Sequence, residues 1–368
     1  MKTIDRLYKD HKPLYPIENI CDSSKALFVD IETTGLKKET TSLYMIGCGF
    51  YTGDGFFTKL FFAEETGEEE NVLREFASFL TGFTHLLHFN GTKFDIPYLL
   101  YKAEKYGIND LFENVEQVDV YRLCKPLRYL LFPETMRQKA IEDFMGIKRD
   151  DTFDGGQLIP VYKEYEKTKD ERLLELLVTH NREDVLGMHL ILPVLYYLDL
   201  KDAPLSFEGY ELNTYSDLDG CDHEEVIFGF STDRPFPKSF VAKTDTMYLK
   251  ASSETGKISI RLPLYDTEMK LFFDNYRDYC YLPDEDTVIP KALASSLPKN
   301  RYRKAVKENC CRKVKGKFMK QPVPVFTPVF RTEYKDRRRY FRFPEDFDKK
   351  AAEQFGRELI NIFFKIRK

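Results

Sequence analysis

Four acidic side chains from three parts of the sequence could together bind divalent metal ions. Asp30 and Glu32 lie two residues apart at the end of an apolar run, and alternate side chains of a strand project from the same face. Asp95 and Asp184 follow further along the chain. Hard cations such as Mg²⁺ take oxygen ligands, and two of them about 4 Å apart can stabilise the attacking and leaving oxygens of a phosphodiester displacement. Brought into one cleft, these four carboxylates would provide the ligands for that reaction.

Taken singly, each group of acids also has a simpler explanation. Asp30 and Glu32 can be a solvated strand end, and Asp95 in the first turn of a helix can interact with the helix dipole. His180 and Asp184 lie four residues apart in a helical stretch, so they share a face and could form a local hydrogen bond. The helix dipole leaves unexplained why an Asn-Gly pair ends the strand just before Asp95. The ordered combination of the three groups therefore favours the metal site.

The first 200 residues predict a mixed sheet flanked by helices, an α/β fold. Apolar runs indicate strands over 26–31, 43–50 and 56–62, and we expect these three to form an antiparallel meander. Apolar residues at helical spacing predict a helix over 69–80. The later elements are expected as strands over 84–89 and 116–120, a helix over 95–106, and helices throughout 122–198. In this order of elements, the acids fall at strand and helix ends.

Residues 200–368 differ in composition and predict a smaller β-rich domain with a terminal helix. Residues 200–223 are polar, and short strands are expected between 224 and 282. Residues 321–330 alternate proline with apolar residues and should be extended. An amphipathic helix is expected over 345–366.

Charge is distributed unevenly along the chain. Residues 1–298 hold 34 Lys and Arg against 52 Asp and Glu, a net charge of −18, whereas residues 299–368 hold 22 against 8, a net charge of +14. Ten of these basic residues lie within 299–320, and a second group surrounds Arg337, Arg338 and Arg339 with tyrosines and phenylalanines between them. An acidic body with a basic tail suggests a polyanion as partner. The alternative is a solvated basic face whose aromatic residues belong to the core.

The composition excludes several classes of protein. With 42% hydrophobic and 32% charged residues, the chain is globular and not disordered. The longest apolar run, 190–198, is too short for a membrane span, and the first residues lack the apolar stretch of a signal peptide. Seven cysteines without a CxxC pair are typical of reduced thiols in a cytoplasmic protein. No glycine-rich motif of a P-loop or a dinucleotide fold is present.

Three segments of the chain resemble the motifs of the DEDD, or DnaQ-like, exonucleases, which have the ribonuclease H-like fold. The segments are 28–35 (FVDIETTG), 88–99 (HFNGTKFDIPYL) and 180–185 (HNREDV). The resemblance covers about residues 24–198, and residues 137–160 further resemble the YprB-type ribonuclease H-like group. It implies that the metal ligands are Asp30, Glu32, Asp95 and Asp184, which we call the acid cluster.

The resemblance also implies a role for His180. DEDD enzymes usually carry a tyrosine four residues, or a histidine five residues, before the last acid. In this chain a histidine stands at the four-residue spacing, where the tyrosine would be. We expect His180 to act as a general base or to orient the attacking water.

The function implied is a metal-dependent nuclease that uses two Mg²⁺ or Mn²⁺ ions, and most specifically a 3′→5′ exonuclease acting on single-stranded DNA or RNA. The alternatives are a ribonuclease H-like endonuclease and a nucleic-acid-binding adaptor that has lost catalysis. A separate helicase partner is compatible with each of these functions, and the sequence does not determine the oligomeric state.

Domain boundaries and further site residues follow from this interpretation. We expect an N-terminal extension over 1–23, a nuclease domain over 24–199, and a C-terminal domain over 200–368 whose basic segment, 299–342, binds nucleic acid. The residues expected to contact the substrate are Thr33, Asn90, Gly91, Arg337, Arg338 and Arg339. For Gly91 a plain turn glycine is the alternative. Asp119 is interpreted as a turn acid, with a supporting position behind the metal ligands as the alternative. Asp150, Asp151 and Asp154 are interpreted as a solvated loop.

Overall fold

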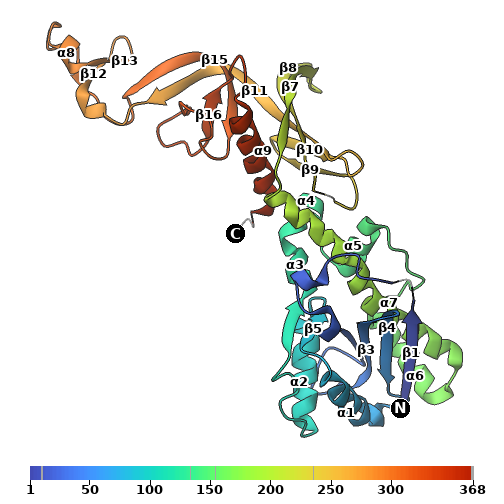
Figure 1. Ribbon diagram of the computed structural model, residues 1–368. Helices are drawn as coiled ribbons and strands as arrows, with labels where there is room; N and C mark the ends of the chain where they lie inside the picture. Colours follow the sequence, from blue (N-terminus) through green and yellow to red (C-terminus); the bar gives the residue numbers. More distant parts are fainter. Residues whose placement is uncertain (10, 133, 154, 235, 366–368) are drawn as a thin grey trace. The chain divides into compact units, whose positions relative to one another are not determined.

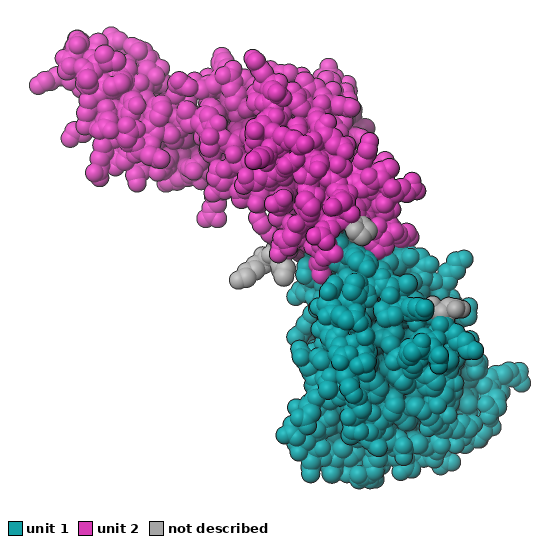
Figure 2. All heavy atoms as spheres, in the orientation of Figure 1, with its two compact units in different colours: residues 1–128, 132–197 teal, residues 129–131, 198–368 magenta. Residues whose placement is uncertain are grey.

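The computed structural model describes residues 1–9, 11–132, 134–153, 155–234 and 236–365, and it divides into two compact units (Figure 1, Figure 2). Unit 1 comprises Met1–Arg128 and Phe132–Tyr197, and unit 2 comprises Tyr129–Leu131 and Leu198–Lys368. Along the chain the main division therefore falls after residue 197, whereas the sequence predicts it after residue 199.

A six-stranded mixed sheet forms the centre of unit 1, in the order β1-β4-β3-β2-β5-β6. The first four strands of this order pair antiparallel, and β2, β5 and β6 pair parallel. The expected antiparallel meander is confirmed, and the whole arrangement is that of a ribonuclease H-like fold. The strands are β1 (Lys2–Tyr8), β2 (Ala26–Thr33), β3 (Leu43–Thr52), β4 (Gly55–Phe62), β5 (His85–His88) and β6 (Glu116–Asp119).

Strand β1 lies in the segment that the sequence predicts only as an extension. It pairs with β4 over its whole length and forms an edge of the sheet. Two of its charged residues, Asp5 and Arg6, are exposed. Charged side chains are common on edge strands, where they discourage pairing with other chains, and they also weaken the apolar alternation that identifies a strand.

Helices pack against this sheet. Helix α1 contacts β3 and β4, and α7 contacts β2, β3 and β4. The predicted helix over 69–80 is confirmed by α1, and α2 begins at Asp95 as expected, with Pro97 in its first turn. The helices of this part of the chain are α1 (Glu69–Leu80), α2 (Asp95–Lys105), α3 (Val120–Cys124), α4 (Arg128–Leu131), α5 (Gln138–Met145), α6 (Gly155–Thr168) and α7 (Glu171–Ile191).

Unit 2 is built around a seven-stranded antiparallel sheet. Its path runs β16-β15-β11-β10-β9, with β8 pairing to β11 and β7 to β8, and a separate three-stranded sheet has the order β13-β12-β14. The strands are β7 (Ser206–Ser216), β8 (Asp222–Ser231), β9 (Phe240–Thr244), β10 (Met247–Ala251), β11 (Lys257–Phe272), β12 (Tyr279–Leu282), β13 (Thr287–Pro290), β14 (Arg303–Lys304), β15 (Cys311–Gln321) and β16 (Arg339–Arg342). The helices are α8 (Lys291–Ala294) and α9 (Lys349–Phe364).

The β-rich character and the terminal helix of this region agree with the sequence, but several strands, β13 to β16 among them, lie where none was predicted individually. Residues 200–223, predicted as polar connection, contain β7, whose eleven residues are mostly exposed. Strand β9 also lies where no strand was placed individually. Helix α9 covers 349–364 of the predicted 345–366, the last residue of which lies outside the described part. Within the described part, none of the helices combines the length and the apolar character needed to span a membrane.

Candidate active site

Two parallel strands position three of the four acids. Asp30 and Glu32 lie near the carboxyl end of β2, and Asp95 begins α2 just after the turn that follows β5. Because β2 and β5 are parallel neighbours, their carboxyl ends meet at the same edge of the sheet. The chain therefore brings residues about 65 positions apart to one place by strand pairing alone.

Two glycines of β3 allow the helix that carries the fourth acid to approach closely. A Cβ atom at Gly47 would lie 1.9 Å from Asn181 Oδ1, and one at Gly49 would lie 2.6 Å from Val185 Cγ1. Both contacts are with α7, so any larger residue would push this helix away from the sheet. The close approach lets Asn181 Nδ2 donate a hydrogen bond to Asp30 Oδ2 at 2.8 Å.

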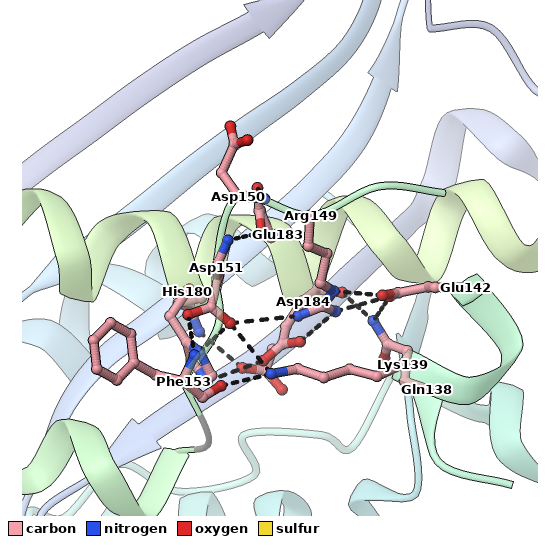
Figure 3. Close-up of polar contacts among 12 residues, drawn as sticks. Gln138, Lys139, Glu142, Arg149, Asp150, Asp151, Phe153, His180, Glu183 and Asp184 are labelled. Carbon is pink, nitrogen blue, oxygen red and sulfur yellow. Dashed lines mark hydrogen bonds and ion pairs between the residues drawn. The ribbon is translucent and has the colours of Figure 1, made fainter. Parts of the chain in front are cut away.

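At this edge, Glu32, His180 and Asp184 face one another. His180 and Asp184 are labelled in Figure 3. His180 Nε2 lies 3.5 Å from Glu32 Oε1 and 3.4 Å from Asp184 Oδ2. One possible ligand atom from each residue lies within 4.8 Å of the other two. The shared face that the four-residue spacing predicts for His180 and Asp184 is thus observed.

The other nitrogen of His180 is bound by an acid that the sequence interpretation left in a solvated loop. Asp151 Oδ2 lies 2.8 Å from His180 Nδ1, and the Asp151 side chain is only 2% exposed. For Asp151 the solvated-loop interpretation is wrong, because residues 149–153 fold back onto α7 and bury its carboxylate. Asp150 is exposed as expected, and Asp154 lies outside the described residues. A carboxylate on Nδ1 fixes the ring and leaves Nε2 facing the acids.

The four acids of the cluster interact electrostatically. Burial raises the pKa of Asp30 and of Glu32 well above the ordinary carboxyl value, and the nearby charge of Asp184 raises both further. Burial also raises the pKa of Asp95 to about 6, and the charge of Asp95 raises the pKa of Asp30 and Glu32 in turn. The four acids therefore act on one another electrostatically, and of the four, Glu32 and Asp184 each place a possible ligand atom within 4.8 Å of the other. This repulsion favours binding of cations.

One cation of the chain already contacts this cluster. Arg149 Nη2 lies 2.6 Å from Asp184 Oδ1, and the same guanidinium donates hydrogen bonds to both carboxylate oxygens of Glu142. Burial opposes the charge of Arg149, but the hydrogen bond with Glu142 and the attraction of Asp184 outweigh it and raise the pKa. Its Nη1 is buried and has no hydrogen-bond partner among the described residues. Sequence reasoning did not identify Arg149 or Glu142 as site residues.

The turn before Asp95 is held by a second buried acid. Asp119 accepts hydrogen bonds from the backbone N–H of Asn90 at 2.9 Å, from Thr92 Oγ1 at 2.9 Å and from the backbone N–H of Tyr121 at 3.1 Å. Its side chain is 5% exposed, and its charge contributes to the raised pKa of Asp95. Asp119 is therefore more than a turn acid, since it orients the loop that leads into the acid cluster.

The structure also places the residues expected at the strand ends. Asn90 is exposed and has a left-handed backbone, with φ of 61°. Gly91 is buried, and a Cβ there would lie 2.8 Å from Asp95 Oδ2 and 3.0 Å from His88 Nδ1. The space around Gly91 is thus filled by the site's own side chains. Thr33 is buried, and its hydroxyl donates to the carbonyl oxygen of Gly35 at 2.9 Å.

The donor set fits a divalent metal ion. Carboxylate oxygens are the ligands that Mg²⁺, Ca²⁺ and Mn²⁺ prefer, and these carboxylates lack enough positive neighbours to neutralise them.

In unit 2 the three consecutive arginines differ in their surroundings. Arg337 is exposed, Arg338 forms an ion pair with Asp336 at 2.9 Å, and Arg339 Nη1 donates to the carbonyl oxygen of Pro322 at 3.3 Å. Of the aromatic residues between them and beyond, Tyr340 and Phe341 are buried. For these two rings the alternative interpretation, that they belong to the core, is confirmed.

Comparisons with known proteins cover the part of the chain that carries the site. Residues 27–196 match the family model RNase_H_2, described as the RNase H superfamily. A search of curated proteins gave no match.

Among solved structures, the chain is similar to the family B DNA polymerase of Pyrobaculum calidifontis, with 18% identity over 48% of this chain and 26% of the polymerase, and a TM-score of 0.37. It is also similar to product-bound exonuclease I, with 13% identity over 56% of this chain and 59% of that one, and a TM-score of 0.29. For E. coli exonuclease I with a dT13 oligonucleotide, the identity is 14% over 56% and 54%, and the TM-score is 0.28. The chain thus spans less than two thirds of each of these proteins.

Proposed function

We propose, from the ribonuclease H superfamily domain that residues 27–196 form, that this chain is a divalent-metal-dependent nuclease with 3′→5′ exonuclease activity on single-stranded DNA or RNA. The observation that carries the proposal is the convergence of Asp30, Glu32, Asp95 and Asp184 from β2, α2 and α7. Burial and mutual repulsion raise the pKa of Asp30, Glu32 and Asp95, and this cost would destabilise a fold unless a ligand compensated it. That electrostatic cost supports a functional and cation-binding role.

The acid cluster would hold two Mg²⁺ or Mn²⁺ ions, which when bound activate the attacking water and stabilise the charge that develops on the leaving 3′ oxygen. The chain's own contribution is to fix the carboxylates before the substrate arrives. Asn181 holds Asp30 by a hydrogen bond, and the narrow space beside Gly91 holds Asp95. Preorganised charges of this kind avoid reorganisation during the reaction.

His180 is suited to accept a proton from the attacking water. With Nδ1–H donated to Asp151, the lone pair of Nε2 points toward Glu32 and Asp184, where the acids converge. After the transfer the proton resides on Nε2, and the negative charges of Asp151 and Glu32 stabilise the resulting imidazolium. His180 therefore takes the role of general base that we expect from the tyrosine or histidine before the last acid in the DEDD exonucleases.

In unit 2 we assign the basic segment 299–342 to substrate binding. Arg337 is the most available of the three arginines, because Arg338 shares its charge with Asp336. Unspecific binding of single strands rests on phosphate contacts of this kind.

A digestion panel tests the function. Linear DNA and RNA labelled at either end, and circular single-stranded DNA, are incubated with Mg²⁺ or Mn²⁺. We expect stepwise loss from the 3′ end of linear strands and no cleavage of circles. Asp30→Asn serves as the inactive variant, and Asp150→Asn, an exposed acid in the same region, serves as the matched control. Cleavage of circles would indicate an endonuclease, and binding without any metal-dependent cleavage would indicate an adaptor.

A further inference from the structure

A cleft of about 660 Å³ opens in unit 1 beside the turn that leads into the acid cluster. One wall is the turn 89–93, and the other is formed by residues of the segments 119–128 and 134–138. None of the three motifs explains why this second wall is basic. The cationic residues that line the cleft are Lys93, Arg122, Lys125, Arg128 and Arg137.

The positive charge of this cleft is opposite in sign to the net charge of unit 1. Unit 1 holds 24 Lys and Arg against 33 Asp and Glu, whereas residues 120–140 hold five against one. Among the residues that the structure describes, two acids line the cleft, Asp119 and Glu134. The carboxylate of Asp119 is already occupied by three hydrogen bonds from Asn90, Thr92 and Tyr121. Arg122 also forms an ion pair with Asp119 at 3.6 Å. The other four cations of the cleft outnumber its remaining acid, Glu134, so the cleft presents excess positive charge, which attracts an anion.

Local helical structure aligns three of the cations. Arg122 lies in α3, Lys125 begins a 3₁₀ turn (Lys125–Leu127), and Arg128 begins α4. Residues three apart lie nearly above one another in a 3₁₀ turn, so these side chains form a row. All three are exposed, while Cys124 and Leu127 between them are buried. A row of cations on one side of a helical segment matches the repeated phosphates of a nucleic acid strand better than a single small anion.

Two aromatic rings lie beside this row of cations. Phe89 and Tyr121 both line the cleft, and their ring centroids are 5.9 Å apart with an interplanar angle of 76°. Both side chains are partly exposed. Rings next to cations are the combination that binds unpaired bases by stacking, whereas the bases of a duplex are covered by their neighbours.

The cleft and the acid cluster share one loop. Asn90 and Thr92 line the cleft, and Gly91 between them is in contact distance of Asp95. On the opposite wall, Asp119 acts electrostatically on Asp95. A strand lying along the cations would therefore approach the cluster from the side of Asp95.

We propose that this basic cleft binds the sugar-phosphate backbone of a single-stranded nucleic acid and leads it to the acid cluster. The delivery of a strand to the acid cluster rests on the proposed nuclease function, whereas binding of the strand by the cleft does not require hydrolysis. Arg122, Lys125 and Arg128 contact successive phosphates, and Phe89 and Tyr121 stack on a base.

The test measures binding by the full chain in EDTA, where no hydrolysis occurs. The probe is a fluorescent oligothymidylate of about twenty nucleotides, titrated at several salt concentrations between roughly 50 and 200 mM. The variant combines Arg122→Gln, Lys125→Gln and Arg128→Gln. The control combines Lys163→Gln, Lys167→Gln and Arg172→Gln, which removes the same charge from exposed positions of α6 and α7. Melting curves verify that both variants fold.

For the cleft variant we expect Kd to rise at least about tenfold and the log–log salt slope to flatten by about 2, since each phosphate contact on a single strand contributes roughly 0.7. An unchanged Kd, or an equal loss in the control, would overturn the proposal. So would equal weakening for a duplex or for a polyglutamate competitor of the same charge. If the protein binds through the cleft but never cleaves nucleic acid, the binding inference stands and the proposed nuclease function fails. If the protein cleaves nucleic acid and the cleft variant binds normally, the nuclease function stands and the binding inference fails.

Discussion

Arg149 Nη2 lies 2.6 Å from Asp184 Oδ1, so an arginine of the chain contacts the last acid of the proposed metal site. The same guanidinium is bound by Glu142, and its side chain is 9% exposed. Arg149 thus supplies part of the positive charge that the acid cluster requires. It follows that stability without metal and affinity for metal depend on this residue in opposite directions.

The first prediction concerns Arg149→Met. Removing the guanidinium leaves Glu142 buried without its charge partner, which should lower the free energy of unfolding in EDTA by about 3 kcal/mol. It also removes a positive charge next to Asp184, so the affinity for Mn²⁺ should rise by about tenfold. Urea unfolding in EDTA and calorimetric Mn²⁺ titration measure the two effects. Adding Glu142→Leu should restore much of the stability, and unchanged Mn²⁺ affinity in both variants would contradict the assignment.

Asp30→Asn should abolish hydrolysis while the metal-free protein keeps or gains stability. The substitution removes one of several mutually repelling carboxylates, and the new side chain oxygen can still accept the hydrogen bond from Asn181. The wild-type melting temperature should increase with Mn²⁺, because a ligand of the native state stabilises it by mass action. The increase should be much smaller in the variant. Absence of any Mn²⁺-dependent shift in the wild type would argue against the site.

Stability should depend on pH through Asp95. Because its pKa is raised to about 6, the folded protein holds a proton there that the unfolded chain has already lost, so stability falls as the pH rises from about 4 to 6. In EDTA, wild-type protein should lose free energy of unfolding over this range relative to Asp95→Asn. Urea unfolding of both proteins at several pH values gives the difference, and parallel curves would refute the prediction. The affinity for Mn²⁺ should weaken as the pH falls below about 6, because protons compete with the metal for Asp95.

Asp151→Asn should reduce kcat by about 10- to 100-fold and leave KM nearly unchanged, because the residue orients His180 and is not expected to bind substrate. Asp150→Asn is the matched control, since it changes the neighbouring but exposed acid. Steady-state kinetics over a range of pH distinguish a role of Asp151 in orienting His180 from a purely structural role. A purely structural role would lower the melting temperature of Asp151→Asn without changing kcat of the folded fraction.

For the basic segment of unit 2, Arg337→Ala should weaken binding of single strands more than Arg338→Ala does. Arg337 is exposed, whereas Arg338 is paired with Asp336. Loss of one phosphate contact should flatten the salt slope by roughly 0.7 and raise KM, with kcat at saturating substrate unchanged. Binding measured at several salt concentrations gives the slope. Equal effects of the two substitutions would contradict this ranking.

Local spacing explains which parts of the site could be predicted from the sequence. Glu32 lies two residues from Asp30 in a strand, and His180 lies four residues from Asp184 in a helix, so each pair shares a face wherever the chain folds. Asp151 and Arg149 are 29 and 35 residues from the partners they contact on α7. Neither the strand nor the helix periodicity relates residues so far apart in the sequence. Their burial is seen only in the folded loop.

The same distinction applies to the fold. The central strands β2, β3 and β4 could be predicted because each is an apolar run bounded by turn residues. Strands β1 and β7 were not predicted, because both carry exposed polar residues and are held chiefly by backbone pairing to a neighbour. Such strands are defined by their partner more than by their own composition.

Gly47 and Gly49 contribute to the site because their lack of a side chain leaves space for α7, and this has a consequence for protein engineering. A design that transplants the four acids to another scaffold would carry every functional group and still omit the space that Asn181 and Val185 occupy. The smallest transferable unit therefore contains strand β3 together with β2, α7 and the start of α2 that carries Asp95. Libraries that vary Gly47 should vary Asn181 at the same time, because a side chain at one position requires a shorter one at the other.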